Sequence, residues 1–290
     1  MRPSAVAAGT FDGFAVASGS RYFTNDVPPN ARGVSVYLNN SGIGISNTCS
    51  AWDARYTNTF DNQITNSFTV TCWAKGWPGG WNPWVSKYGE NGKGWQLRTD
   101  GSAPTYPCFT IRNNSAGTVT LGVAAYGNPE DMASRSIAIG NDGKWHHYAG
   151  TFDAGSGTRS LYVDGELAAA ETGNAPCNLT ATNRLMLGAR DGGSSASSSG
   201  GYGNYFTGYL YDVRIYNSAA SQTQVRNLAA LTPPSVASQM VNGKQLVLTW
   251  SWGTLLQATN LLGPWTPVQA ASPYTNSRTA SQQFFRISNP

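Results

Sequence analysis

Three tryptophans stand within eight residues of a segment that proline and glycine keep out of regular structure. They are Trp77, Trp81 and Trp84, in the run Trp-Pro-Gly-Gly-Trp-Asn-Pro-Trp, and Tyr88 follows closely. Sugars present C–H-rich faces that stack on aromatic rings, and exposed rings are costly unless they are used. We therefore predict that this loop is a stacking platform for a polysaccharide, helped by hydrogen bonds from nearby Asn and Asp. The alternative is a loop folded over the edge of a sandwich, with its tryptophans plugging the core.

A second loop, residues 191–201, consists of Ser, Gly and Ala after an opening aspartate. This composition predicts a flexible segment. It leads into Tyr-Gly-Asn-Tyr, so Tyr202 and Tyr205 form another predicted sugar-contacting edge.

Carboxyl groups decide whether such a site could also cleave a glycan, because glycosidic bonds are usually hydrolysed by two carboxyl groups about 5 to 10 Å apart. The chain holds four glutamates, namely Glu90, Glu130, Glu166 and Glu171. Glu90 stands near the tryptophan loop and Asp191 opens the Ser/Gly loop, so these two are the candidates for an acid/base pair. The alternative is that each is a solvated loop charge. No Gly-x-Ser-x-Gly elbow supports an esterase triad.

The two histidines, His146 and His147, are neighbours in the sequence. Adjacent residues of a strand point to opposite faces of a sheet, so the two side chains do not form a metal-binding pair. We expect both to be structural, with His146 as a minor catalytic candidate.

The composition is that of an extracellular β protein. Charged residues make up 12% of the chain, against roughly 25% in an average globular protein. The net charge is +4 without a run of Lys or Arg, which argues against nucleic-acid binding. No stretch of about 18 apolar residues predicts membrane insertion, and residues 1–9 lack the apolar core of a signal peptide. We expect a secreted, monomeric protein.

Four cysteines, Cys49, Cys72, Cys108 and Cys177, are the disulfide candidates. None belongs to a Cys-x-x-Cys pair, so a zinc site is not indicated. An even number of cysteines in a secreted chain permits disulfides, with three connectivities open. Cys72 lies in an alternating segment and could instead be a small core residue.

Alternation with a period of two dominates the chain and is interrupted by Asp-Gly and Asn-Gly pairs that favour tight hairpins. The pattern predicts an all-β sandwich or jelly roll. The expected strands cover residues 34–38, 68–74, 94–98, 108–112, 118–126, 145–152, 160–163, 184–187 and 208–216, and further along 245–250, 254–258 and 284–287.

One helix is expected after a capping box that runs from Ser221 to Gln224. Consecutive prolines in residues 232–235 then make a stiff linker. We therefore predict a sandwich domain over residues 1–231, the linker, and a small β module over residues 236–290 that acts as a spacer or anchor.

Four segments in order resemble one family: residues 68–75, 143–153, 159–166 and 206–217. Together they are similar to the LamG-like, or concanavalin A-like lectin/glucanase, superfamily over roughly residues 33–231. The resemblance implies a jelly-roll sandwich of two antiparallel sheets, often with a structural calcium ion. The C-terminal piece resembles short β modules of secreted proteins from polysaccharide-degrading bacteria.

The resemblance implies a calcium site near Asp212, with Asn39 standing where relatives usually have an aspartate. Asn offers a neutral oxygen and should bind calcium more weakly. The alternative is that Asp212 pairs with Arg214. The Glu-x-Asp-x-x-Glu strand motif of the laminarinase-like enzymes is absent.

The predicted function is therefore lectin-like binding of a polysaccharide or other glycan by aromatic stacking. A glycoside hydrolase on the same fold is the first alternative. An adhesion or structural module that binds protein is the second.

Overall fold

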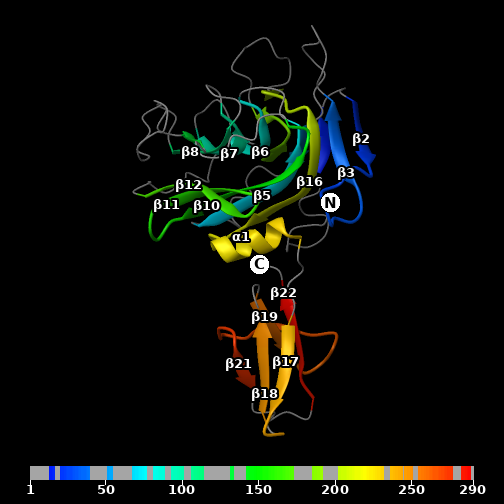
Figure 1. Cartoon of the computed structure of the whole chain (residues 1–290), viewed down its shortest axis with the longest axis vertical. Coiled ribbons are helices and arrows are strands. Elements are labelled where there is room, and N and C mark those ends of the chain that lie inside the picture. Colours follow the sequence, from blue (N-terminus) through cyan, green and yellow to red (C-terminus); the bar gives the residue numbers. More distant parts are fainter. Residues whose placement is uncertain are drawn as a thin grey trace. The chain divides into compact units, whose positions relative to one another are not determined.

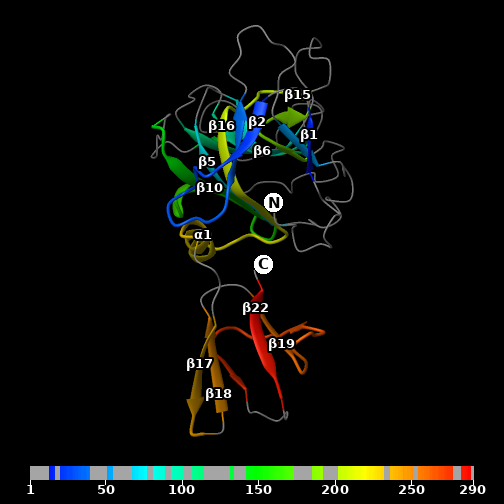
Figure 2. The same ribbon diagram turned by 90° about the vertical axis from the view of Figure 1, so that its right-hand side faces the viewer.

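The computed structural model of the chain divides into two compact units, Met1–Ala229 and Ala230–Pro290. Figures 1 and 2 show the strands that build each unit. The structure describes residues 13–16, 20–39, 51–54, 67–76, 81–88, 93–100, 106–113, 131–133, 142–172, 185–191, 202–231, 236–243, 245–250, 254–276 and 282–288.

Two antiparallel sheets, each with seven strands among the described residues, face one another in the larger unit. The first sheet has the order β1 (Gly13–Val16), β4 (Ala51–Ala54), β13 (Leu185–Leu187), β6 (Pro83–Tyr88), β7 (Lys93–Thr99), β8 (Pro107–Asn113) and β9 (Asp131–Ala133). The second sheet has the order β12 (Glu166–Glu171), β11 (Thr158–Val163), β10 (Trp145–Asp153), β5 (Phe68–Lys75), β16 (Gly208–Tyr216), β3 (Ser35–Asn39) and β2 (Ser20–Thr24). This is a jelly-roll sandwich, as the alternation predicted; residues 118–126 lie outside the described part.

The core lies between the sheets and is built by the inward half of each alternating strand. In β5, Phe68 and Val70 are fully buried members of the core. The Phe68 ring lies 5.5 Å from the Trp95 ring and 6.0 Å from the Phe109 ring of the first sheet. Gly150 of β10 leaves room for this packing, since a Cβ there would come within 2.5 Å of Phe109.

The helix α1 (Gln222–Ala229) follows β16 and packs on the outer face of the second sheet. The predicted capping box is confirmed: the Ser221 backbone N–H donates to Gln224 Oε1 at 2.7 Å, and the Gln224 N–H donates to Ser221 Oγ at 3.3 Å. Val225 packs against Ala149 and Tyr162 of the sheet. The helix therefore shields one end of this outer face.

The described residues of the smaller unit form two three-stranded antiparallel sheets. One has the order β17 (Val236–Val241), β18 (Gln245–Trp250), β21 (Tyr274–Asn276) and the other β20 (Thr266–Pro267), β19 (Thr254–Ala258), β22 (Phe284–Ser288). The predicted Asn-Gly hairpin joins β17 to β18, because Asn242 and Gly243 both adopt positive φ. Among the described residues, no helix is long and apolar enough to cross a membrane.

Candidate functional site

Trp81 occupies the turn before β6 and is a member of the predicted platform that the structure shows to be exposed. Its side chain is 40% exposed. The backbone is held at a φ of 68°, and the Trp81 carbonyl accepts a hydrogen bond from Asn204 Nδ2 at 3.0 Å. The turn is closed on β7, where the Asn82 N–H donates to Thr99 Oγ1 at 3.1 Å. Trp81 is thus fixed in place while much of its ring stays open.

A buried guanidinium supports the Trp81 ring from below. Arg98 of β7 is only 1% exposed, and its guanidinium carbon lies 4.6 Å from the Trp81 ring centroid. Arg98 Nε donates to Thr110 Oγ1 at 3.0 Å, and Nη1 donates to the Thr99 carbonyl at 2.7 Å. Because the cation covers one face of the indole, the exposed part of the ring lies on its other face and its edges.

The residues that flank the predicted Ser/Gly loop lie next to Trp81. Arg190 and Asp191 form β14 (Arg190–Asp191), which pairs with β15 (Tyr202–Gly203). Asn204 follows and holds Trp81 as described, and the half-buried Tyr205 comes next. The structure therefore brings the two predicted loops together at Trp81. For Asp191 and Tyr202 it describes the backbone alone.

Two other members of the predicted platform are buried instead. Trp84 is fully buried and stacks on Tyr148 of the opposite sheet, with ring centroids 4.0 Å apart and planes 12° apart. Tyr88 is only 5% exposed. The prediction that Trp84 and Tyr88 stack on sugar is therefore wrong. The register of β6 shifts between Pro83 and Val85, and this bulge turns Trp84 inward. Trp77 and Glu90 lie outside the described residues.

Arg98 belongs to a polar row on the face of the first sheet that points away from the core. Cross-strand pairing places Ser86 opposite Gln96, and Gln96 opposite Thr110. All three are buried, and within the described part of the chain Ser86 Oγ and Gln96 Oε1 have no hydrogen-bond partner. Sequence reasoning missed this row, although polar residues at every second position of 94–100 were a usable signal.

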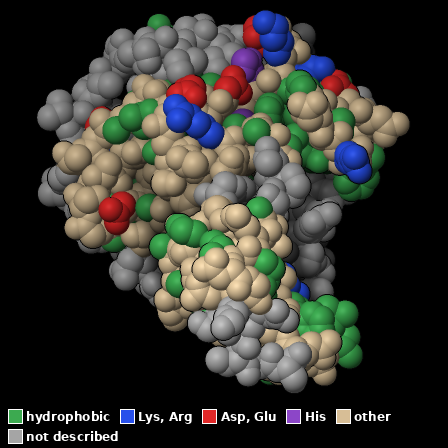
Figure 3. Space-filling model, turned by 60° about the horizontal axis from the view of Figure 1, so that its bottom comes forward, with side chains coloured by type: hydrophobic (Ala, Val, Ile, Leu, Met, Phe, Trp, Pro, Cys, Tyr) green, Lys and Arg blue, Asp and Glu red, His purple; other side chains and the backbone are tan. Residues whose placement is uncertain are grey.

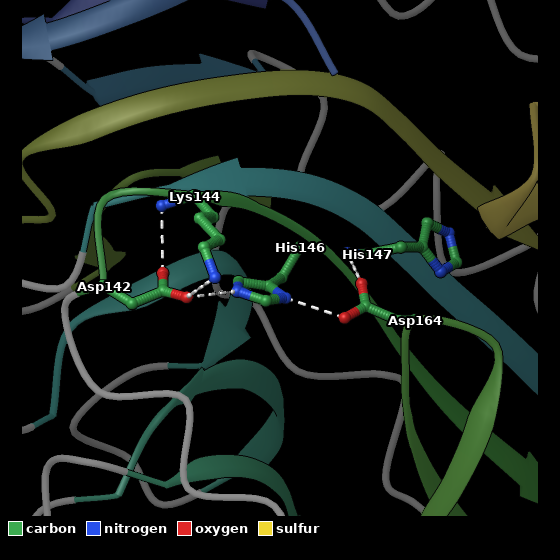
Figure 4. Close-up of polar contacts among 5 residues, drawn as sticks. All are labelled: Asp142, Lys144, His146, His147 and Asp164. Carbon is green, nitrogen blue, oxygen red and sulfur yellow. Dashed lines mark hydrogen bonds and ion pairs between the residues drawn. The ribbon is translucent and has the colours of Figure 1, made fainter. Parts of the chain in front are cut away.

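His146 connects two loops at the start of β10 (Figure 4). Its Nδ1 lies 2.7 Å from Asp164 Oδ2, and its Nε2 lies 3.3 Å from Asp142 Oδ2. Burial opposes the charge on the ring, but the hydrogen bonds and charges of both carboxylates outweigh it and raise the pKa of His146. Asp164 also accepts the His147 backbone N–H at 2.8 Å. His146 thus clamps the turn at Asp142 to the β11–β12 hairpin.

His147 points to the opposite face of the sheet from His146, as the strand pattern predicted (Figure 4). It is 1% exposed and meets Trp73 edge to face at 5.5 Å. Burial lowers the pKa of His147 to about 3, so this ring is neutral at ordinary pH. The pair cannot ligate one metal ion.

A further aromatic group on the outer face of the second sheet surrounds Asp26. Lys75 Nζ donates to Asp26 Oδ2 at 2.5 Å, and Trp145 Nε1 donates to Asp26 Oδ1 at 2.8 Å. Tyr209 pairs with Lys75 on one side and with Tyr37 on the other, with Lys75 Nζ 5.1 Å from the Tyr209 ring and the Tyr37 ring at 4.6 Å. Burial opposes the Asp26 charge, yet these donors lower the pKa of Asp26. The contacts anchor the segment between β2 and β3 to the sheet.

The family is decided by a match of residues 50–226 to the model described as the concanavalin A-like lectin/glucanases superfamily. The chain belongs to this superfamily. No curated protein sequence matches it.

Several solved structures are similar to this chain at low sequence identity. The binding domain of Paraclostridial Mosquitocidal Protein 1 has a TM-score of 0.52 and 10% identity over 95% of this chain and 65% of its own. The botulinum neurotoxin DC binding domain, solved with rat synaptotagmin II, has a TM-score of 0.50 and 10% identity over 91% and 75%. The CBM40 module of the Ruminococcus gnavus IT-sialidase, bound to α2,3-sialyllactose, has a TM-score of 0.46 and 14% identity over 63% and 92%. This chain therefore spans less than two thirds of the mosquitocidal binding domain.

The calcium site that the superfamily resemblance implied does not fit the described residues. Both Asp212 oxygens are engaged by Arg214, with Nε donating to Oδ1 at 2.8 Å and Nη2 lying 2.7 Å from Oδ2. Leu38 pairs with Gly208, the first residue of β16, so Asn39 lies beyond the start of that strand, whereas Asp212 stands at its middle, about 16 Å along the strand. Among the described residues, no three His, Cys, Asp or Glu side chains gather as metal ligands. The predicted alternative, in which Asp212 pairs with Arg214, is the arrangement observed.

Two of the four disulfide candidates are buried thiols. Cys72 and Cys108 are both fully buried and neither forms a disulfide. Burial raises the pKa of the Cys72 thiol, as expected for a small core residue. Cys49 and Cys177 lie outside the described residues.

Proposed function

We propose that the protein is a secreted carbohydrate-binding module of the superfamily, and that Trp81 is its stacking platform. The observation that carries this proposal is the Trp81 ring, 40% exposed on one side and supported by the Arg98 guanidinium on the other. A large indole left open at the end of a β-sandwich is costly unless a ligand covers it.

Preorganisation supports binding at this position. Side-chain ordering on binding costs about 0.5 to 1.5 kcal/mol for a flexible group. Trp81 is already held by the Asn204 hydrogen bond, the turn at Asn82 and the cation beneath its ring. Little ordering entropy therefore remains to be lost when a sugar ring stacks on it.

The chemistry of the surroundings fits a polyhydroxylated ligand. Asn204 holds the Trp81 backbone, and the half-buried Tyr205 follows it in the chain, so this segment offers an amide and a hydroxyl group. Binding of this kind needs no group to change its protonation state and no bond to break. In this proposal the smaller unit serves as a spacer or anchor.

A polysaccharide panel tests the proposal. Wild-type protein and Trp81→Ala are run on polysaccharide affinity gels, and the eluates are assayed for new reducing ends. Trp265→Ala is the matched control, because Trp265 also rests on an arginine, Arg286, at 4.3 Å, but in the smaller unit. We expect retention of the wild type and of the control, loss of retention in Trp81→Ala, and no reducing ends. Release of reducing ends would instead identify a glycoside hydrolase.

A further inference from the structure

The smaller unit exposes two consecutive leucines at the tip of a turn. Leu262 is 93% exposed and Leu261 is 64% exposed. The space-filling view shows hydrophobic side chains gathered at an edge of this unit (Figure 3). Single exposed leucines are ordinary, but two adjacent ones at a turn tip form a protruding apolar point.

The turn holds both leucines outward without help from a partner. Asn260 Oδ1 accepts the Leu262 N–H at 3.0 Å, and the Asn260 carbonyl accepts the Gly263 N–H at 3.0 Å. Gly263 takes a φ of 95°, which favours glycine. The turn is therefore preformed, and its own hydrogen bonds hold the two leucines at the surface.

An aromatic side chain adjoins the turn, because a Cβ at Gly263 would lie 3.0 Å from Trp265 Cδ1. The Trp265 ring is half-buried and packs on the Arg286 guanidinium, whose carbon is 4.3 Å from the ring centroid. Tryptophan is enriched at membrane–water interfaces, and arginine pairs with phosphate groups there. Leucine, tryptophan and arginine are the residue types that suit the acyl, interfacial and phosphate levels of a bilayer.

The charge of the smaller unit points in the same direction. Residues 230–290 contain three cations, Lys244, Arg278 and Arg286, and neither Asp nor Glu, so this unit carries +3 of the chain's net +4. A unit without a single acidic side chain is complementary to an anionic surface.

We propose that the Leu261–Leu262 turn docks the smaller unit on an anionic phospholipid bilayer. A protein partner would typically need about 800 Å² of surface on each side, which a two-residue convex tip does not offer. A bilayer interface accepts such a tip because headgroups and acyl chains move aside. This shallow contact differs from the spanning segment whose absence the sequence indicates.

Vesicle flotation of the full chain tests this proposal. The vesicles contain phosphatidylcholine alone or phosphatidylcholine with about 30% phosphatidylglycerol. The second composition gives the vesicles a negative surface that attracts basic proteins. We expect the wild type to float with the anionic vesicles, less with the neutral ones, and less again at high salt. Leu261→Ser with Leu262→Ser should reduce the partition coefficient by at least about tenfold.

Met240→Ser is the matched control, because Met240 is 45% exposed in the same unit but lies in β17, away from the turn. It should change flotation by less than about twofold. The leucine variant should keep the wild-type retention on polysaccharide, so that failure of lipid docking is distinguishable from failure of carbohydrate binding. Absence of wild-type flotation, indifference to vesicle charge, or unchanged flotation of the double variant would overturn the proposal.

Discussion

Arg98 and Trp81 form a stacked pair in which a 1% exposed guanidinium lies 4.6 Å from the centroid of a 40% exposed indole. The arginine is anchored in the first sheet by Thr110 and by the Thr99 carbonyl. The tryptophan is anchored by Asn204 from the second loop. This pair is where the rigid sandwich meets the surface that we propose for binding.

A substitution of Arg98, which supports the Trp81 ring, should weaken polysaccharide binding while Trp81 itself is kept. Arg98→Lys keeps the charge but loses the Nε donor to Thr110 and the flat surface under the indole. A cation–π contact contributes about 1 kcal/mol, so we expect a rise in polysaccharide Kd of roughly 3- to 10-fold by calorimetry. Arg286→Lys, under Trp265, is the control and should leave the Kd unchanged. Equal effects of the two changes would contradict the role of Arg98.

The packing between the two sheets should not tolerate a larger side chain at Gly150. Alanine there would place its Cβ 2.5 Å from the Phe109 ring, and overpacking of this kind costs about 1 to 3 kcal/mol. We expect Gly150→Ala to lower the free energy of unfolding of the larger unit by that amount in a urea titration. Gly155→Ala, whose Cβ would meet only Asp153 Oδ1 at 3.4 Å, should be close to neutral. Equal stability of both variants would argue against this packing.

His146 should make stability depend on pH. Although burial opposes its charge, Asp164 and Asp142 raise the pKa of His146 above the ordinary value of 6.5. A raised folded-state pKa stabilises the fold below the unfolded pKa, and this contribution is lost as the pH rises through the folded pKa. Both carboxylates are partly exposed, so the contribution is about 0.5 to 1 kcal/mol.

Urea titrations between pH 5.5 and 8.5 measure this effect. The free energy of unfolding of the wild type should fall as the pH rises above about 6.5. His146→Gln should flatten that part of the profile, because the amide keeps hydrogen bonding but does not titrate. A variant whose profile still falls like that of the wild type would show that another group is responsible.

Asp212 should stabilise the fold through its ion pair with Arg214, and this contribution should not depend on calcium. Asp212→Asn keeps a residue that tolerates the φ of 48° but loses the charged contact with the guanidinium. We expect the free energy of unfolding to fall by about 1 to 2 kcal/mol, equally with and without EDTA. If EDTA destabilises the wild type and the substitution removes that sensitivity, Asp212 is a calcium ligand after all.

Features fixed by short-range chemistry were predictable from the sequence. Asp164 and Gly165 both adopt positive φ, as an Asp-Gly hairpin requires, and Ser221 caps α1 through the reciprocal bond with Gln224. Alternation with a period of two identified the strands because one face of each sheet is buried against the other. The sandwich follows from these local signals, whereas the superfamily follows from the resemblance of the four segments.

The candidate site depends on longer-range facts that residue types do not carry. Trp84 lies in the same Trp-rich run as Trp81, yet the bulge in β6 sends Trp84 into the core and leaves Trp81 at the surface. Asn204 reaches Trp81 across 123 residues of sequence. In the sequence, Arg98 is simply one polar residue of a predicted strand. The sequence does not show that the Trp81 ring lies over its guanidinium.

The affinity of Trp81 variants for the retained polysaccharide tests the central claim most directly. By isothermal titration calorimetry, Trp81→Ala should raise the Kd at least about tenfold, as truncation of a central tryptophan does, and Trp81→Phe should raise it less. The larger unit should stay folded, and its unfolding free energy should fall by only about 1 kcal/mol, because the ring is partly exposed and its cation–π contact with Arg98 is lost. A Trp81→Ala protein that is folded and binds with the wild-type Kd would contradict the account.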